Sequence, residues 1–318
     1  SAQFFPSSGI SHEQVRVSLE AFRAMLAEGG TADELAAETL KRFDFYISVG
    51  CDDLGTVLFT GYYTPIFKAS RTRNGVYQHP LHRLPPNHVK DPITGETKGL
   101  RRDDGTVDAN YPARAQLLRG GTLDGLELVW LADPVEAYVV QVQGSALLDL
   151  DDGTRLEVGY AGTNGAPYKS LGQEMVRRGM LKREELTLTS IMRYFRDNPG
   201  EFDSLAAANP RYVFFQETSG GPFGSLNEQV TAGRSIATDK AIFPRGSLVL
   251  ADVPTLGGYR RLLLDQDTGG AIRAPGRCDL YWGTGRGAEM RAGKTYHEGR
   301  LYYLVLKDLP AAESRVQK

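Results

Sequence analysis

The stretch R-R-L-L-L-D-Q-D-T-G-G-A-I-R-A-P-G-R-C-D-L-Y-W-G, residues 260–283, consists of two short β-type runs around a loop rich in Gly and Pro. The run Leu262–Leu264 leads to Asp267, and the second run begins at Asp279. Both carboxylates therefore lie at predicted strand ends, where side chains can face a groove. Short apolar runs bounded by turn residues predict a domain built mainly from β-strands.

The same pattern extends over the C-terminal third of the chain. Short strands joined by Gly and Pro turns predict a small closed barrel, and Val57–Phe67, interrupted by Pro65, is the candidate that completes it. We therefore expect residues 1–69 and 212–318 to form one domain, mainly β with helices, and residues 70–211 to form an inserted second domain. The C-terminal strands are expected at Tyr212–Gln216, Arg234–Thr238, Ser247–Val253, Arg260–Asp265, Cys278–Trp282 and Leu301–Leu306.

Capping-box spacings, which pair a Ser or Thr with a Gln or Glu three residues later, predict helix starts at Ser11 and Thr31. Residues 70–115 are rich in turns and charges, and we interpret them as an excursion outside any core. In the rest of the middle segment we expect strands at Leu126–Ala132, Ala137–Gln143 and Arg155–Tyr160, with a hairpin turn at Asp151–Gly153 between the last two. We expect helices at Ser170–Arg178 and at about Leu188–Asp197, and a third, short helix that runs to Ala208.

Composition excludes several classes of protein. The 318 residues are 41% hydrophobic and 24% charged, and Lys plus Arg (37) nearly balances Asp plus Glu (39). A net charge of −2 argues against nucleic-acid binding, which needs a basic surplus. No apolar run approaches the ~18 residues of a transmembrane helix. The two cysteines, Cys51 and Cys278, form no C-x-x-C pair and H-E-x-x-H does not occur, so we expect no metal site.

An acidic cluster carries the main chemical hypothesis. When two carboxylates are held close together, one stays protonated, and a protonated Asp can act as a general acid near neutral pH. We therefore select Asp267 and Asp279, together with Asp239. The alternative is that they are Asp residues in Gly turns, where Asp side chains accept local hydrogen bonds. Asp267-Thr268-Gly269 also matches the D-T-G of aspartic peptidases, but those enzymes need a second copy, which is missing.

Polar side chains beside aromatic ones form a second candidate site. Tyr rings can stack on sugar rings, while amides and hydroxyls can pair with sugar hydroxyl groups. The alternative is ordinary turn chemistry, with a helix N-cap at Ser170. The stretch Gly159–Gly165 lacks the spacing of a phosphate-binding loop. The candidate residues are Gln143, Ser145, Asn164, Tyr168 and Lys169.

From about residue 57 to its end, the chain resembles the membrane-bound lytic transglycosylase A family, whose C-terminal "3D" domain is named for three aspartates. Each matching stretch is weak alone, but together and in this order they are specific. They are GYYTP at 61–65, VQGSA at 142–146, GYAGTNGAPYKSLG at 159–172, NPRYVFF at 209–215, GRSIATD at 233–239 and DTGGAIRAPGRCDLYWG at 267–283.

The resemblance implies a double-psi β-barrel catalytic domain, a smaller inserted β-barrel-like domain and a glycan groove between them. It implies cleavage of the β-1,4 bond between N-acetylmuramic acid and N-acetylglucosamine with formation of a 1,6-anhydro end, and no cofactor. Asp279 corresponds to the catalytic acid and base, Asp267 to its neighbour and Asp239 to the third aspartate. The implied substrate-binding residues are Tyr63, Thr64, Gln143, Gly144, Ser145, Tyr160, Asn164, Tyr168, Lys169, Ser170 and Gly270.

The implied partner is the glycan strand of peptidoglycan, and we expect a monomer that does not bind nucleic acid. The family is anchored through a lipid on an N-terminal Cys, which this sequence does not contain, at the periplasmic side of a Gram-negative outer membrane. Two alternatives stay open: a glycoside hydrolase with two carboxylates on the same barrel, and a non-catalytic peptidoglycan-binding module. The reaction product and a turnover assay distinguish them.

Overall fold

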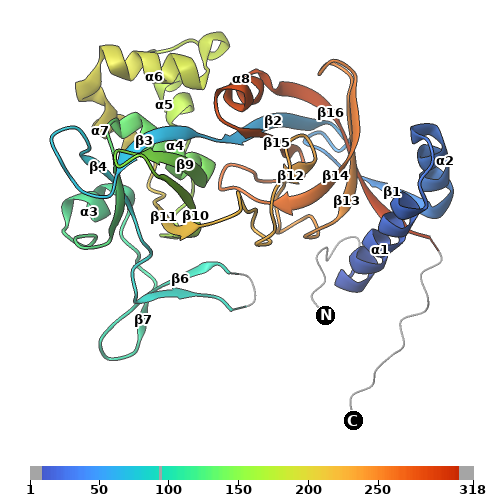
Figure 1. Ribbon diagram of the computed structural model, residues 1–318, viewed down its shortest axis with the longest axis horizontal. Coiled ribbons are helices and arrows are strands. Elements are labelled where there is room, and N and C mark those ends of the chain that lie inside the picture. The colour runs from blue at the N-terminus through green and yellow to red at the C-terminus, as the bar shows by residue number, and fades with distance from the viewer. Residues whose placement is uncertain (1–8, 93–94, 308–318) are drawn as a thin grey trace. The chain divides into compact units, whose positions relative to one another are not determined.

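The computed structural model describes residues 9–92 and 95–307 (Figure 1). Contacts divide the chain into two compact units. The barrel unit holds the residues up to Gly61, Gly224–Trp282 and the residues from Lys294 onward. The inserted unit holds Tyr62–Phe223 and Gly283–Gly293. The boundaries expected from sequence, 69/70 and 211/212, lie within the inserted unit.

The barrel unit is built on a closed ring of six strands, which confirms the small closed barrel predicted from sequence. Strand order is β16-β13-β14-β12-β15-β2, and an additional pairing of β16 with β2 closes the ring. The segment near Val57 supplies β2, as predicted, and β1 (Phe43–Ile47) extends the sheet beyond β16. The ring strands are β2 (Val57–Thr64), β12 (Ser235–Ala237), β13 (Leu248–Val253), β14 (Tyr259–Asp267), β15 (Arg277–Thr284) and β16 (Tyr296–Leu306).

Alternate residues of these strands fill the barrel, as the two-residue period of a strand requires. Phe59, Ile236 and Leu280 are fully buried members of this core. Helix α1 (His12–Glu28) packs on the outside against β16 and β13. The capping boxes predicted at Ser11 for α1 and at Thr31 for α2 (Ala32–Arg42) are both confirmed.

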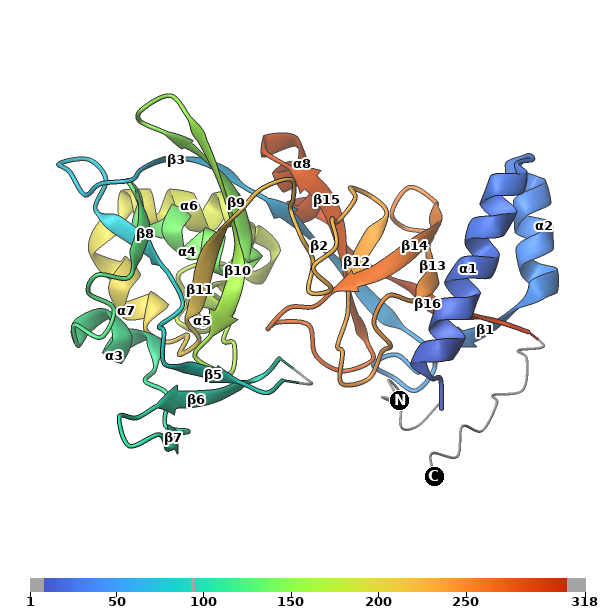
Figure 2. The same ribbon diagram turned by 60° about the horizontal axis from the view of Figure 1, so that its bottom comes forward.

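The inserted unit contains a second sheet of six strands in the order β11-β10-β9-β3-β8-β4 (Figure 2). An isolated bridge between Arg83 and Phe215 joins its two edges, so the sheet curves back on itself as a barrel does. The strand expected at Tyr212–Gln216 among the barrel strands is wrong in its placement, because it forms β11 and pairs with β10 of this sheet, while β3 pairs with β9. The strands are β3 (Ile66–Ser70), β4 (His79–His82), β8 (Glu127–Leu131), β9 (Ser145–Leu150), β10 (Arg155–Thr163) and β11 (Val213–Thr218).

The strand predicted at Ala137–Gln143 is wrong, because Pro134–Gln143 forms helix α4. Its β-branched composition suggested a strand, but the flanking residues are strong helix signals: Asp133 caps the first turn, Pro134 occupies the first position and Gly144 ends the helix in the left-handed conformation. The helix is apolar almost all round because one side packs on the sheet and the other on the helices that follow. The predicted hairpin turn therefore joins β9 and β10.

Three helices pack on the side of α4 that faces away from the sheet, and their residue ranges are close to those predicted from sequence. They are α5 (Leu171–Arg177), α6 (Leu188–Asp197) and α7 (Phe202–Ala206), preceded by the 3-10 turns Arg183–Glu185 and Pro199–Glu201. Met175, Phe195 and Leu205 pack with α4 in one buried cluster. Helix α8 (Arg286–Lys294) was not predicted.

The expectation that residues 70–115 stay outside the core is wrong at β4, where Leu81 is fully buried and pairs with Val129 of β8. The remainder of this segment does leave the main sheet. It forms a separate three-stranded sheet of β5 (His88–Lys90), β6 (Thr97–Arg101) and β7 (Val107–Asp108), followed by α3 (Arg114–Arg119) (Figure 1).

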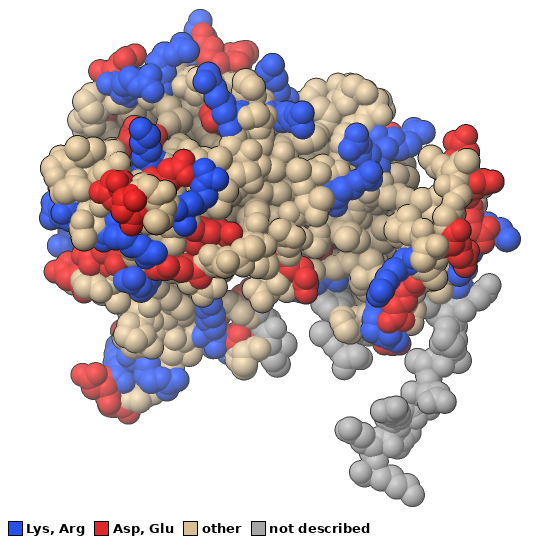
Figure 3. Space-filling model, in the orientation of Figure 1, with Lys and Arg blue, Asp and Glu red and all other residues tan. Residues whose placement is uncertain are grey.

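Positive and negative side chains are interspersed on the face of the molecule drawn in Figure 3, as the near-balanced composition suggests. None of the helices in the described ranges is both long enough and apolar enough to span a bilayer.

Candidate active site

Strand register aligns two of the three selected aspartates. Ala237 of β12 pairs with Asp267 of β14 on one side and with Asp279 of β15 on the other. In-register neighbours in a sheet point to the same face, and the neighbouring Ile236 and Leu280 point into the barrel core. Asp267 and Asp279 therefore share the outer face of the barrel, about 10 Å apart at Cα across two strand spacings.

Asp279 is held through one carboxylate oxygen. Its Oδ1 accepts hydrogen bonds from the Thr60 hydroxyl and from Nε of Arg277, the latter at 3.0 Å. Nε of Arg277 also lies 3.0 Å from the Thr60 oxygen, so the three groups form a closed triangle. Oδ2 makes no hydrogen bond to any described residue, and the side chain is 13% exposed. One oxygen is thus fixed while the other is available to a ligand.

Asp239 is bound on both oxygens. Oδ1 accepts from the amide of Ala241 at 3.1 Å, and Oδ2 accepts from the amide of Ala274 at 3.0 Å. The guanidinium of Arg273 lies 3.6 Å from Oδ1. This aspartate therefore ties the turn after β12 to the loop between β14 and β15, and the geometry suits positioning better than proton transfer.

Asp267 accepts hydrogen bonds from two backbone amides, those of Ser225 at 2.9 Å and Thr268 at 2.8 Å. No hydrogen bond joins it to Asp279, because Ala237 lies between them. Gly270 follows in the loop that leads from β14 to β15. Residues 260–283 thus supply most of β14 and β15 and the loop between them. Hydrogen bonds to Asp267 and Asp239 hold the two ends of this loop.

Beneath this face, a buried ion pair lies inside the barrel. Lys240 donates to Asp265, which is fully buried and also accepts from the hydroxyls of Thr238 and Tyr303 at 2.7 Å each. Burial, which outweighs the attraction of Asp265, lowers the pKa of Lys240. Thr238 precedes Asp239 and Asp265 lies two residues before Asp267, so this network fixes the backbone that carries both aspartates.

In the inserted unit, the structure brings the motifs at 61–65 and 142–146 together. The amide of Tyr63 donates to the Gln143 side chain at 3.1 Å, and the hydroxyls of Thr64 and Ser145 lie 3.3 Å apart. Gly144, between Gln143 and Ser145, ends α4 with a φ of 84°. This left-handed turn reverses the chain and lets both neighbours face the segment at Tyr63.

Tyr63 is only 3% exposed, so its ring packs rather than offering an open stacking surface. Burial raises the pKa of its hydroxyl, and the negative charges of Glu289 and Glu136 raise it further. Burial also raises the pKa of Glu136 to about 7, with a smaller contribution from the charge of Asp133.

Tyr160 differs from Tyr63 because its side chain is 49% exposed, so its aromatic ring is open to a ligand.

The remaining selected residues lie in one loop. Asn164 is buried, and its amide group donates to the carbonyls of Pro112 and Pro210 at 2.9 Å, so it holds the loop rather than facing solvent. The backbone amide of Lys169 donates to the side chain of Asn209 at 3.1 Å. The residue is exposed, so its ammonium group does not take part in this contact. Ser170 caps α5, and Tyr168, which precedes Lys169 in the chain, is half-buried.

Comparison with known proteins identifies the family. Residues 58–216 match the model of the MltA specific insert domain, and residues 234–305 match the 3D domain. The membrane-bound lytic murein transglycosylase A of Escherichia coli K12 is 34% identical over 274 residues, covering 83% of this chain and 69% of the relative. The corresponding protein of Vibrio cholerae is 32% identical over 274 residues, covering 82% and 68%.

The chain belongs to the membrane-bound lytic murein transglycosylase A family. Solved structures of this family agree with the fold. A membrane-bound lytic murein transglycosylase from Agrobacterium tumefaciens superposes with a TM-score of 0.79 at 28% identity, covering 94% of this chain and 86% of that one. E. coli MltA with bound chitohexaose gives 0.75 at 29% identity, with the same coverage of 94% and 86%. The resemblance seen in the sequence motifs is thereby confirmed.

Thr60 and Arg277 both contact Asp279, but neither was selected from the sequence. Arg277 lies two positions before Asp279, so the period of a strand places both on one face, and this signal was available. Thr60 reaches Asp279 only because β2 lies beside β15 in the barrel. Within the described ranges, no group of three His, Cys, Asp or Glu side chains is arranged to hold a metal ion.

Proposed function

We propose that Asp279 is the single catalytic acid and base of this peptidoglycan lytic transglycosylase. The observation that carries the proposal is the asymmetry of its carboxyl group. Oδ1 is fixed by Thr60 and Arg277, whereas Oδ2 has no partner among the described residues. A general acid needs an oriented carboxyl group with one oxygen within reach of the substrate, and Asp239 lacks such an oxygen.

The reaction needs only one carboxyl group. The protonated Oδ2 of Asp279 gives its proton to the oxygen of the β-1,4 bond, and the bond from that oxygen to C1 of N-acetylmuramic acid breaks. The C6 hydroxyl of the same sugar attacks C1, and its proton goes to the Asp279 carboxylate. The products are a free hydroxyl on N-acetylglucosamine and a 1,6-anhydro end, and Asp279 is protonated again. Because the nucleophile belongs to the substrate, the enzyme gains an effective molarity on the order of 10⁵ M or more.

The other selected residues receive supporting roles in this proposal. Asp267 shares the outer face with Asp279 and places a second carboxylate on it. Asp239 positions the loop before Asp279. In the inserted unit, we assign glycan binding to Gln143, Ser145 and the exposed Tyr160, because amides and hydroxyls match sugar hydroxyl groups. Gly144, Tyr168, Lys169 and Ser170 complete this binding set, with Gly270 beside the aspartates, while the buried residues Tyr63, Thr64 and Asn164 support it by holding its backbone in place.

The decisive experiment is digestion of purified peptidoglycan, followed by mass spectrometry of the released fragments. Wild type should release 1,6-anhydro ends. Asp279→Asn should reduce the rate by ~10²–10⁴-fold, the usual size of acid–base catalysis, while keeping chitohexaose affinity, since the amide has nearly the same shape. Asp267→Asn should lose less. Asp44→Asn, an exposed change on β1, is the control.

Each alternative gives a different result. Reducing ends in place of anhydro ends would indicate a hydrolase that uses a second carboxylate and water. Glycan binding without turnover in wild type would indicate a binding module. A larger loss in Asp267→Asn than in Asp279→Asn would exchange the two roles.

We also propose that the enzyme acts as a monomer at the periplasmic side of a Gram-negative outer membrane, where a lipid anchor holds it next to the glycan strands. The word "membrane-bound" in the names of its relatives supports an envelope location. Separation of inner and outer membranes by density, followed by immunodetection, tests this. Recovery in the cytosolic fraction would overturn it.

A further inference from the structure

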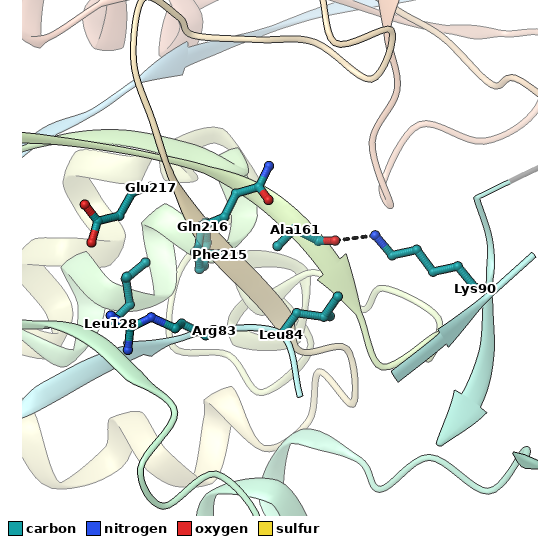
Figure 4. A pocket seen from close by; sticks show the side chains of 8 residues that line it. All are labelled: Arg83, Leu84, Lys90, Leu128, Ala161, Phe215, Gln216 and Glu217. Atoms are coloured by element: carbon teal, nitrogen blue, oxygen red, sulfur yellow. Dashed lines mark hydrogen bonds between the residues drawn. The ribbon is translucent and has the colours of Figure 1, made fainter. Parts of the chain in front are cut away.

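A cavity of about 290 Å³ opens where the two edges of the inserted sheet meet (Figure 4). It lies beside the bridge between Arg83 and Phe215 that closes the sheet. Lys90 and Leu84 line one part of it, and Gln216 and Glu217 of β11 line another. None of these residues belongs to the machinery described above, and all of them lie in the inserted unit.

A bulge in β10 shapes one wall of this cavity. The register between β10 and β11 shifts between Tyr160 and Gly162, so Ala161 is left out of the ladder. The ammonium of Lys90 donates to the freed carbonyl of Ala161, as Figure 4 shows. A Cβ on Gly162 would lie 2.7 Å from Leu84 and 3.3 Å from Lys90, so glycine at this position permits the close approach. Bulges commonly re-aim groups beside binding sites.

The charges around the cavity are unbalanced. Lys90 pairs with no carboxylate of the described chain, and burial lowers its pKa. Arg83 donates to the carbonyl of Glu127 at 2.7 Å and forms no ion pair with the described residues. The carboxylate on the wall, Glu217, is already bound by Arg71. Lys90 therefore borders the cavity without a carboxylate partner, together with the amide of Gln216, whereas Arg83 contributes a weaker attraction to Glu217.

We propose that this cavity binds a carboxylate of the peptide stem that peptidoglycan carries on its muramic acid residues. The inference rests on the proposed function. An ammonium without a carboxylate partner recognises a carboxylate through charge-assisted hydrogen bonds, and Arg83 adds positive charge nearby, whereas the acetylated sugars offer no charge. The volume suits a group of amino-acid size, with Leu84 against its apolar part. Strand β11 pairs with β10 along one edge, and a single bridge joins its Phe215 to Arg83, the residue after β4, on the other.

The test compares Lys90→Met and Arg83→Gln with Lys68→Met, which removes a charge from an exposed side chain of β3 in the same unit. Substrates are peptidoglycan with stems and strands from which an amidase has removed the stems. The lost charge-assisted contact should raise KM about tenfold on stem-bearing strands, which corresponds to ~1.4 kcal/mol. The kcat, the KM on stripped strands and the Kd for chitohexaose should stay unchanged, as should all values for Lys68→Met.

A second measurement does not depend on catalysis. Wild type should bind the isolated stem peptide, and conversion of its carboxylates to carboxamides should weaken binding at least tenfold. Failure of wild type to form anhydro ends would overturn the proposed function but leave this binding result interpretable. An equal KM increase on stripped strands would assign the cavity to a part of the glycan that both substrates share and overturn the peptide assignment, because the lactyl carboxylate of muramic acid is free only after the stem has been removed. An unchanged KM on both substrates would overturn the site altogether.

Discussion

At the residue scale, Arg277 distinguishes Asp279 from an ordinary surface aspartate. Its Nε contacts both Asp279 and the Thr60 hydroxyl at 3.0 Å, so it orients the carboxyl group and also places a positive charge beside it. Loss of the Arg277 contact should therefore leave the carboxyl group of Asp279 less well oriented for proton transfer.

Arg277→Gln should lower the maximum rate, because Asp279 loses one of its two fixed contacts. Arg277→Lys, which keeps a donor at this position, should lose less. The measurement is the initial rate of anhydro-end formation on purified peptidoglycan at one fixed pH. A wild-type rate in Arg277→Gln would show that Thr60 alone suffices to orient the carboxyl group.

Glu136 should make folding stability depend on pH. Burial raises its pKa in the folded protein to about 7, above the ordinary value of about 4.3 that it has when unfolded. The folded state therefore binds more protons between these values, and stability should fall as pH rises from about 4 to about 7. Glu136→Gln should flatten this decline, as measured by urea unfolding across that range. Glu184→Gln, at an exposed position, should leave it unchanged.

At the element scale, the end of α4 connects stability with ligand binding. Gly144 has a φ of 84° and open space around the position of a Cβ, so Gly144→Ala introduces backbone strain but no clash. That strain should cost about 1 kcal/mol of unfolding free energy. Because Gln143 and Ser145 flank the turn, chitohexaose affinity should fall as well. Gly179→Ala, with a φ of 74° and equally open surroundings, should cost similar stability and leave affinity intact.

The buried pair of Lys240 and Asp265 joins the end of β12 to β14. Lys240→Met removes the partner of a fully buried carboxylate, which should destabilise the protein by about 3–5 kcal/mol. The double variant Lys240→Met with Asp265→Leu should recover most of that loss, because no buried charge remains. Urea denaturation measures both. If the double variant is as unstable as the single one, shape rather than charge dominates at this position.

At the scale of the whole molecule, we propose that the two contact units are the domains and unfold independently. Val249 in the barrel core and Val158 in the inserted core are both fully buried. Substitution of either by Ala should cost about 2 kcal/mol. By native-state hydrogen exchange, Val249→Ala should reduce protection of β13 and β14 only, and Val158→Ala that of β10 and β11 only. Equal loss across the chain in both variants would show a single cooperative unit.

Sequence alone determined the local structure and the family. Capping residues located α1 and α2, alternating short apolar runs located the barrel strands, and the motifs identified the relatives, because each of these signals lies within a few residues of chain. Tertiary structure decided the rest. Ala137–Gln143 is buried on both sides, so its apolar pattern alone does not distinguish a helix from a strand, and only the flanking residues indicate the helix. Thr60 contacts Asp279, and Lys90 contacts the bulge at Ala161, through pairings between distant segments, which only the packed fold brings together.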